Sequence, residues 1–214
     1  MQEVFQRLAH TKKHVYAVTA SIRETELLSP PGFGGHHDPH VWFDVRLWTS
    51  CVESVVKGLS AAAPEHREYF QKQGKIVEAQ MEQLHTWAKA KAEELPKEKR
   101  ILITSHDAFN YFGRAYGFEV VGLQGISTVD EASLDSMTKL VDFIKRRQVK
   151  AIFVESSVPP AAIQRISQDA HIKIGGELFS DAMGTPGQME DGYDLGTYEG
   201  MIKHNLNIVV RALK

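Results

Sequence analysis

Side chains of types that can bind a metal ion follow three apolar, strand-like segments of the sequence. His106 comes after the segment 101–105, and Glu155 comes directly after the segment 151–154. Asp181 follows a third such segment. Ligands of open α/β sheets sit outside the carboxyl ends of the strands. We therefore expect one imidazole and two carboxylates to converge at one crevice.

A fourth residue of this kind, His40, lies at the end of a loop rich in proline, glycine and histidine, residues 29–40. Imidazoles and carboxylates without thiolates suit Zn²⁺, Mn²⁺ or Fe²⁺, whereas a site for Ca²⁺ or Mg²⁺ needs no histidine. The residue types thus favour His40, His106 and Asp181 as ligands of a transition metal. Glu155 is either a further ligand or a carboxylate that orients a histidine.

Each of these residues also has a purely structural interpretation. His106 at a strand end can be a hydrogen-bonded core histidine, and Asp181 can cap a turn. Glu155 can cap the helix that Pro159 begins. His36 and His37 are most simply solvated loop residues, although a mobile loop with extra histidines can capture a metal ion.

Other site chemistries have little support. The sequence contains no HExxH, Gly-x-Ser-x-Gly, Walker or Gly-x-Gly-x-x-Gly motif. A metal-dependent hydrolase stays open, because Asp107 or Glu155 could act as its base.

Residue patterning in the first half predicts mainly helices. Val4, Phe5 and Leu8 form the apolar stripe of an N-terminal helix. The alternating, β-branched stretch 14–19 predicts a strand. Helical spacing predicts a helix over 45–63 and a long one over 64–95, which could span the molecule as a strut or form a coiled-coil arm.

After the charged break at 96–100, strands alternate with helices. The expected strands are 101–105, 118–123, 150–155 and 171–179, and the expected helices are about 108–116, 129–147, 159–169 and 196–213. Thr128 and Glu131 have capping-box spacing for the second of these helices. Such alternation predicts βαβ units and a parallel sheet, an α/β fold. The stretch 182–196 reads as a long loop.

Composition places the chain among ordinary globular proteins. Its 214 residues are 43% hydrophobic and carry a net charge of −2, without the basic patches that nucleic-acid binding requires. No apolar run is long enough for a membrane span, and the N-terminus lacks the pattern of a signal peptide. The single Cys51 excludes an internal disulfide and is expected to be a buried small hydrophobe.

Four motifs, in order along essentially the whole chain, resemble the zinc/manganese solute-binding proteins of ABC transporters, closest to the TroA type. They are His37-Asp38-Pro39-His40-Val41-Trp42-Phe43-Asp44, Thr104-Ser105-His106-Asp107-Ala108-Phe109, Ile152-Phe153-Val154-Glu155-Ser156-Ser157 and Gly175-Gly176-Glu177-Leu178-Phe179-Ser180-Asp181. The resemblance implies two Rossmann-like lobes joined by a long helix, with a metal ion held at their interface and handed to a membrane permease. The family's ligands map to His40, His106 and Asp181.

The resemblance also implies a division into domains. Residues 1–63 would be the remainder of an N-terminal α/β lobe, residues 64–95 a long linking helix and residues 96–214 a C-terminal α/β lobe. Family members carry another ligand histidine and a signal sequence upstream, so we expect this chain to be truncated within an incomplete N-lobe. An exposed sheet edge there would invite self-association.

The expected function is therefore extracytoplasmic capture of Zn²⁺, Mn²⁺ or Fe²⁺ for an ABC permease, without catalysis. The full-length form is expected in the periplasm or anchored as a lipoprotein. Histidine at position 106 favours zinc over manganese, since manganese-preferring relatives carry glutamate there. The alternatives are a metal-dependent hydrolase and an adhesin or interaction module that retains a structural metal.

Overall fold

The computed structural model describes residues 15–124 and 133–214, which form two compact units. One unit contains the chain up to residue 27 and residues 45–85, and the other contains residues 28–44 and 86–214. The predicted N-terminal helix and the Thr128–Glu131 capping box lie outside the described residues. The boundaries 1–63, 64–95 and 96–214 stay predictions.

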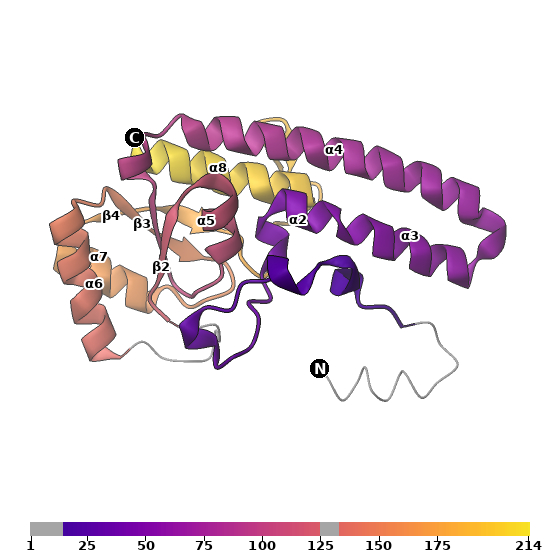
Figure 1. Cartoon of the computed structure of the whole chain (residues 1–214). Coiled ribbons are helices and arrows are strands. Elements are labelled where there is room, and N and C mark those ends of the chain that lie inside the picture. The colour runs from indigo at the N-terminus through magenta and orange to yellow at the C-terminus, as the bar shows by residue number, and fades with distance from the viewer. Residues whose placement is uncertain (1–14, 125–132) are drawn as a thin grey trace. The chain divides into compact units, whose positions relative to one another are not determined.

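The regular elements in the described part of the first unit are all helices (Figure 1). They are the short 3-10 helices η1 (Val18–Ser21), η2 (Glu24–Glu26) and η5 (Pro64–His66), and the α-helices α2 (Val45–Thr49), α3 (Cys51–Ala62) and α4 (Arg67–Glu93). The strand predicted at 14–19 is wrong over its described residues, because 15–17 are irregular and η1 follows. The predicted helices at 45–63 and 64–95 are confirmed.

α4 is the longest helix in the described chain and continues from the first unit into the second. Its 27 residues span about 40 Å at 1.5 Å per residue. Leu84, Ala88 and Ala92 recur at a spacing of four and are buried, so one apolar face of the helix is covered.

The second unit has the α/β fold that the sequence predicts (Figure 1). Its strands are β1 (Ile101–Thr104), β2 (Glu119–Gly122), β3 (Ala151–Glu155), β4 (Lys173–Leu178), β5 (Met189–Glu190) and β6 (Tyr193–Asp194). Its helices are η3 (Pro31–Phe33), η4 (Val41–Phe43), η6 (Lys97–Lys99), α5 (Asn110–Tyr116), α6 (Leu134–Arg147), α7 (Ala161–Ala170) and α8 (Tyr198–Leu213).

β1 pairs with β2 and β3 pairs with β4, both in parallel, while β1 also lies against β3. Consequently the carboxyl ends of β1 and β3 meet at one edge, where His106 and Glu155 lie. The apolar residues of these strands are packed by α6 and α7 through Leu140, Ile144, Ile163 and Ile166.

α8 covers β4 closely. A Cβ at Gly175 would lie 2.7 Å from the Cβ of Ala212, and one at Gly176 would lie 2.7 Å from Ile208, so both glycines permit this approach. Gly176 interrupts the regular β3–β4 register with a φ of 149°. The stretch 182–196 is not only a loop, because β5 and β6 form a small antiparallel hairpin within it.

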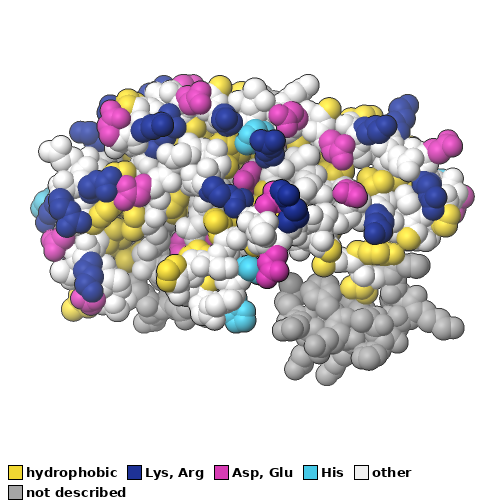
Figure 2. Space-filling model, in the orientation of Figure 1, with side chains coloured by type: hydrophobic (Ala, Val, Ile, Leu, Met, Phe, Trp, Pro, Cys, Tyr) yellow, Lys and Arg dark blue, Asp and Glu magenta, His cyan; other side chains and the backbone are white. Residues whose placement is uncertain are grey.

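Charges of both signs are interspersed over the face shown in Figure 2. No helix in the part of the chain that the structure describes is long and apolar enough to cross a membrane.

Candidate metal centre

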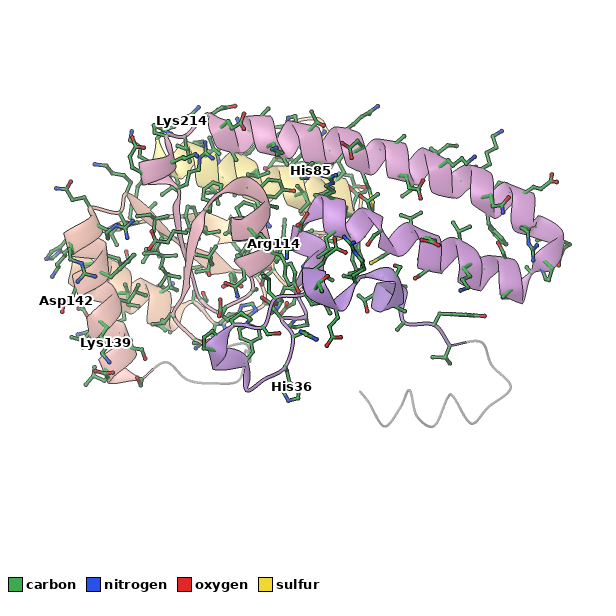
Figure 3. All side chains as sticks on the ribbon, in the orientation of Figure 1. His36, His85, Arg114, Lys139, Asp142 and Lys214 are labelled. Atoms are coloured by element: carbon green, nitrogen blue, oxygen red, sulfur yellow. The ribbon has the colours of Figure 1, made fainter. Side chains whose placement is uncertain are left out.

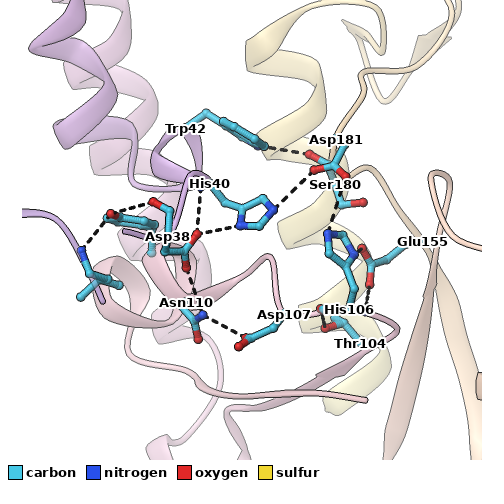
Figure 4. A network of polar contacts seen from close by, with 12 residues as sticks. Asp38, His40, Trp42, Thr104, His106, Asp107, Asn110, Glu155, Ser180 and Asp181 are labelled. Carbon is cyan, nitrogen blue, oxygen red and sulfur yellow. Dashed lines mark hydrogen bonds and ion pairs between the residues drawn. The ribbon is translucent and has the colours of Figure 1, made fainter. Parts of the chain in front are cut away.

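His40, His106 and Asp181 come together in the second unit (Figure 4). One nitrogen of each imidazole and one carboxylate oxygen of Asp181 all lie within 4.8 Å of one another. Nε2 of His40 is 3.6 Å from Oδ1 of Asp181, and Nε2 of His106 is 3.6 Å from Oδ2. Two ligands about 2.1 Å from a tetrahedral ion lie about 3.4 Å apart. The spacing of the three side chains therefore suits one small cation.

A carboxylate fixes His40 so that its Nε2 faces the centre. Asp38 Oδ1 accepts the backbone N–H of His40 at 2.9 Å and lies 2.6 Å from its Nδ1. Pro39 between them removes a donor and restricts the chain to this tight turn. Oδ2 of Asp38 accepts a hydrogen bond from Asn110 at 3.0 Å. Asp38 is buried, so this pairing is shielded from water.

Glu155 makes the corresponding contacts with His106. Its Oε1 accepts the backbone N–H of His106 at 2.9 Å, and its Oε2 lies 2.6 Å from Nδ1. Both residues are buried. Since Nδ1 faces a carboxylate, Nε2 is the nitrogen left for a ligand, and it has no hydrogen-bond partner among the described residues. A carboxylate behind an imidazole in this way is typical of metal-binding histidines.

Burial and neighbouring charge shift the pKa values at the centre. Burial lowers the pKa of His106, but the contact with Glu155 and the charges of Glu155, Asp181 and Asp107 outweigh it, so the net pKa is raised. Burial raises the pKa of Asp107, against a hydrogen bond from Asn110. The acidic neighbours that raise the pKa of His106 also attract a cation to the centre.

Asp181 is the open side of the centre. Its side chain is 37% exposed, whereas those of His40 and His106 are 4% and 0% exposed. The residues before it are anchored, because the carbonyl of Ser180 accepts the indole N–H of Trp42 at 3.1 Å and the hydroxyls of Ser180 and Ser157 are 2.5 Å apart. An ion could thus enter past Asp181 and meet two buried imidazoles.

Comparisons with known proteins identify the family. The family described as zinc-uptake complex component A, periplasmic (ZnuA) matches residues 1–212. The chain belongs to this family. The resemblance inferred from the four motifs is confirmed.

Curated relatives align with all or nearly all of this chain. Manganese-binding lipoprotein MntA of Bacillus subtilis is 41% identical, over 100% of this chain and 69% of that protein. Zinc-binding protein TroA of Treponema pallidum is 43% identical, over 100% of this chain and 68% of that protein. The metal ABC transporter substrate-binding lipoprotein SloC of Streptococcus mutans is 32% identical, over 95% of this chain and 64% of that protein.

A solved structure supports the same assignment. The periplasmic zinc binding protein TroA from Treponema pallidum superimposes with a TM-score of 0.91 at 42% identity, over 100% of this chain and 76% of that chain. The expected α/β fold of the ZnuA family is therefore confirmed for this chain.

The remaining predicted residues lie elsewhere in this ZnuA family member. His36 and His37 are exposed, and His36 projects outward from its loop (Figure 3). His37 Nδ1 contacts the hydroxyl of Ser29 at 2.8 Å. Neither is part of the His40–His106–Asp181 group.

Asp38 and Trp42 were not predicted as functional residues from the sequence. The spacing Asp-Pro-His was a usable signal for Asp38, because an Asp side chain readily accepts the N–H two residues later. Trp42 also contacts His40 edge-on, with ring centroids 5.3 Å apart, and its carbonyl accepts the hydroxyl of Tyr198 at 2.6 Å. No local signal in the sequence indicates these long-range contacts.

Proposed function

We propose that this chain binds a divalent transition metal through Nε2 of His40, Nε2 of His106 and a carboxylate oxygen of Asp181. The observation that carries the proposal is the meeting of two carboxylate-backed imidazoles and one half-open carboxylate at spacings of 3.6 Å. Two neutral nitrogen ligands and one anionic oxygen ligand suit Zn²⁺ or Mn²⁺, and also Fe²⁺. Glu155 serves as the partner of His106 rather than as a ligand.

Three protein donors leave at least one position open on a tetrahedral ion. A water molecule, a buffer anion or a further protein group can fill that position. An ion held this way can be exchanged, which is what a carrier requires. The nitrogen donors favour zinc over manganese, although metal availability also decides occupancy.

The biological role that we propose is capture of this metal outside the cytoplasm and its delivery to an ABC permease. Membership of the ZnuA family supports this role. Three relatives support it too: MntA is a manganese-binding lipoprotein, TroA is a zinc-binding protein and SloC is a metal ABC transporter substrate-binding lipoprotein. We expect no catalysis, and a periplasmic or lipoprotein-anchored location. Self-association through an N-lobe edge stays a prediction.

Elemental analysis followed by competitive titration with Zn²⁺ and Mn²⁺ tests the proposal. The wild type should bind about one ion per chain, and His40→Ala should lose that binding. His36→Ala is the matched control, because His36 is an exposed histidine outside the group. Equal binding by the His40 variant and the wild type would contradict the proposal, as would turnover of phosphoester or amide substrates.

A further inference from the structure

Asn205 of α8 contacts both backbone polar groups of Phe179, two residues before Asp181. Its Oδ1 accepts the N–H of Phe179 at 3.0 Å, and its Nδ2 donates to the carbonyl of Phe179 at 2.8 Å. β4 ends at Leu178, so the amide side chain replaces the strand partner that Phe179 would otherwise need. Asn205 is only 1% exposed, and its two bonds are therefore shielded from competing water.

An amide is the side chain that fits this position. Asn presents one donor and one acceptor on the same planar group, which matches the C=O and N–H of one residue. An aliphatic residue would leave both groups of Phe179 without these bonds. An aspartate would place a second acceptor against the Phe179 carbonyl.

The neighbouring residue on α8, His204, holds the strand before this point. Its Nε2 lies 3.0 Å from the carbonyl of Glu177, and its Nδ1 lies 2.9 Å from Glu190 in the hairpin. Its ring packs against the ring of Phe179, with the two ring centroids 4.7 Å apart. The backbone entering Asp181 is thus held by two successive residues of α8.

The side chain of Asp181 is 37% exposed, so its position depends on the backbone that carries it. Its Oδ1 lies 3.6 Å from Nε2 of His40 and its Oδ2 lies 3.6 Å from Nε2 of His106, so the carboxylate is placed between the two imidazoles. Small rotations of the backbone at 179–180 would move the carboxylate away from one of them. The geometry of its approach therefore depends on what holds Phe179.

We propose that Asn205 is a positioning residue for metal binding, which aims the Asp181 carboxylate at the ion by holding the backbone of Phe179. This inference rests on the metal-binding function proposed above. Removing residues that orient metal ligands costs about 10- to 100-fold in affinity. Asn205→Ala should lower zinc affinity by about that factor without abolishing folding.

A double-mutant cycle separates positioning from general damage to the fold. The zinc affinities of wild type, Asn205→Ala, Asp181→Asn and the double variant are measured by competitive titration. If Asn205 acts through Asp181, its substitution changes affinity by less than about twofold once Asp181 is already replaced. A full additional loss in the double variant would overturn the proposal.

Asn207→Ala is the matched control, because Asn207 lies on the same helix but donates to the Tyr193 hydroxyl at 3.2 Å. It should leave zinc affinity unchanged. Thermal unfolding of each metal-free variant checks the fold. If Asn205→Ala does not fold, Asn205→Asp, which keeps the side-chain volume, takes its place in the cycle.

The absorption spectrum of the Co²⁺ complex gives a second measurement. Loss of a correctly placed carboxylate should change the ligand-field bands of Asn205→Ala in the same direction as those of Asp181→Asn. A spectrum identical to that of the wild type would overturn the positioning role. If the wild type itself binds neither Zn²⁺ nor Co²⁺, the proposed function fails; if only the coupling is absent, the function stands and the role of Asn205 fails.

Discussion

Asp38 contacts His40 at two atoms, its backbone N–H at 2.9 Å and its ring Nδ1 at 2.6 Å, through the single oxygen Oδ1. Glu155 contacts the same two atoms of His106, with Oε1 at the backbone N–H and Oε2 at the ring Nδ1. Each histidine is thus fixed in both its backbone and its ring. This repeated arrangement leaves both Nε2 atoms directed at Asp181 (Figure 4).

Replacing the carboxylate behind a histidine should weaken metal binding without removing a ligand. Asp38→Asn and Glu155→Gln should each lower zinc affinity by about 10- to 100-fold, because the imidazole loses its charged partner. Competitive titration measures the change. Asp44→Asn is the control, since Asp44 lies in the same segment but pairs with Arg114 at 3.1 Å. An equal loss in all three variants would mean that the effect is not specific to the histidines.

Metal affinity should fall as the pH falls, because the ligand imidazoles must be deprotonated. The raised pKa of His106 places the onset of this loss above the range of an ordinary imidazole, about 6.5. Below that pKa, affinity should drop about tenfold per pH unit for each proton displaced. Titrations between about pH 5 and pH 8 check this, and a flat profile would contradict the use of histidine ligands.

In the metal-free protein, the contribution of His106 to the free energy of unfolding should depend on pH in the opposite sense to metal affinity. Burial lowers the folded pKa of His106, but Glu155 and the other acidic neighbours outweigh burial, so the folded pKa is raised. The contribution of His106 to stability is therefore complete below the unfolded pKa of about 6.5. That contribution is lost as the pH rises through the folded pKa. Thermal unfolding of chelator-treated wild type and Glu155→Gln should therefore differ most at the acidic end. A difference that grows with pH would show that the sign is wrong.

Cys51 should be unreactive in the folded protein. Its side chain is buried in α3, and burial raises the pKa of the thiol to about 11, so little thiolate exists at neutral pH. A colorimetric thiol reagent at pH 8 should react slowly with the native chain and at once after denaturation, with one thiol per chain. Rapid labelling of the native protein would contradict the burial of Cys51.

Gly122, at the end of β2, permits the turn that follows His106. A Cβ there would lie 2.8 Å from Cα of Asp107 and 2.9 Å from its nitrogen. Gly122→Ala must therefore displace backbone, which typically costs about 1–3 kcal/mol. Denaturant unfolding should show this loss together with weaker zinc binding. Unchanged unfolding and zinc affinity would mean that the turn tolerates the added methyl group.

The sequence predicted the parallel α/β pattern after residue 100 because each strand there is a short apolar run followed by a helical period. His106, Glu155 and Asp181 stood out because polar residues at the ends of such runs meet in a parallel sheet. His40 was found through its Pro/Gly/His loop and its motif. These predictions need only local pattern and one rule of topology.

Other features were missed for physical reasons. The stretch 14–19 has strand-like residues, but a strand needs a neighbouring strand, and none of the β-ladders among the described residues includes 15–19. The β5–β6 hairpin turns at Asp191 and Gly192, both with positive φ, and the Asp-Gly pair was an overlooked signal. The role of Asn205 depends on a contact 26 residues away, which no local pattern reveals.

The most direct test of the metal centre is a crystal structure of the zinc-loaded chain with an anomalous difference map at the zinc absorption edge. We expect one strong peak about 2.0–2.2 Å from Nε2 of His40, Nε2 of His106 and a carboxylate oxygen of Asp181. A peak at the exposed pair His36 and His37, or one held by Glu155 in place of Asp181, would contradict it.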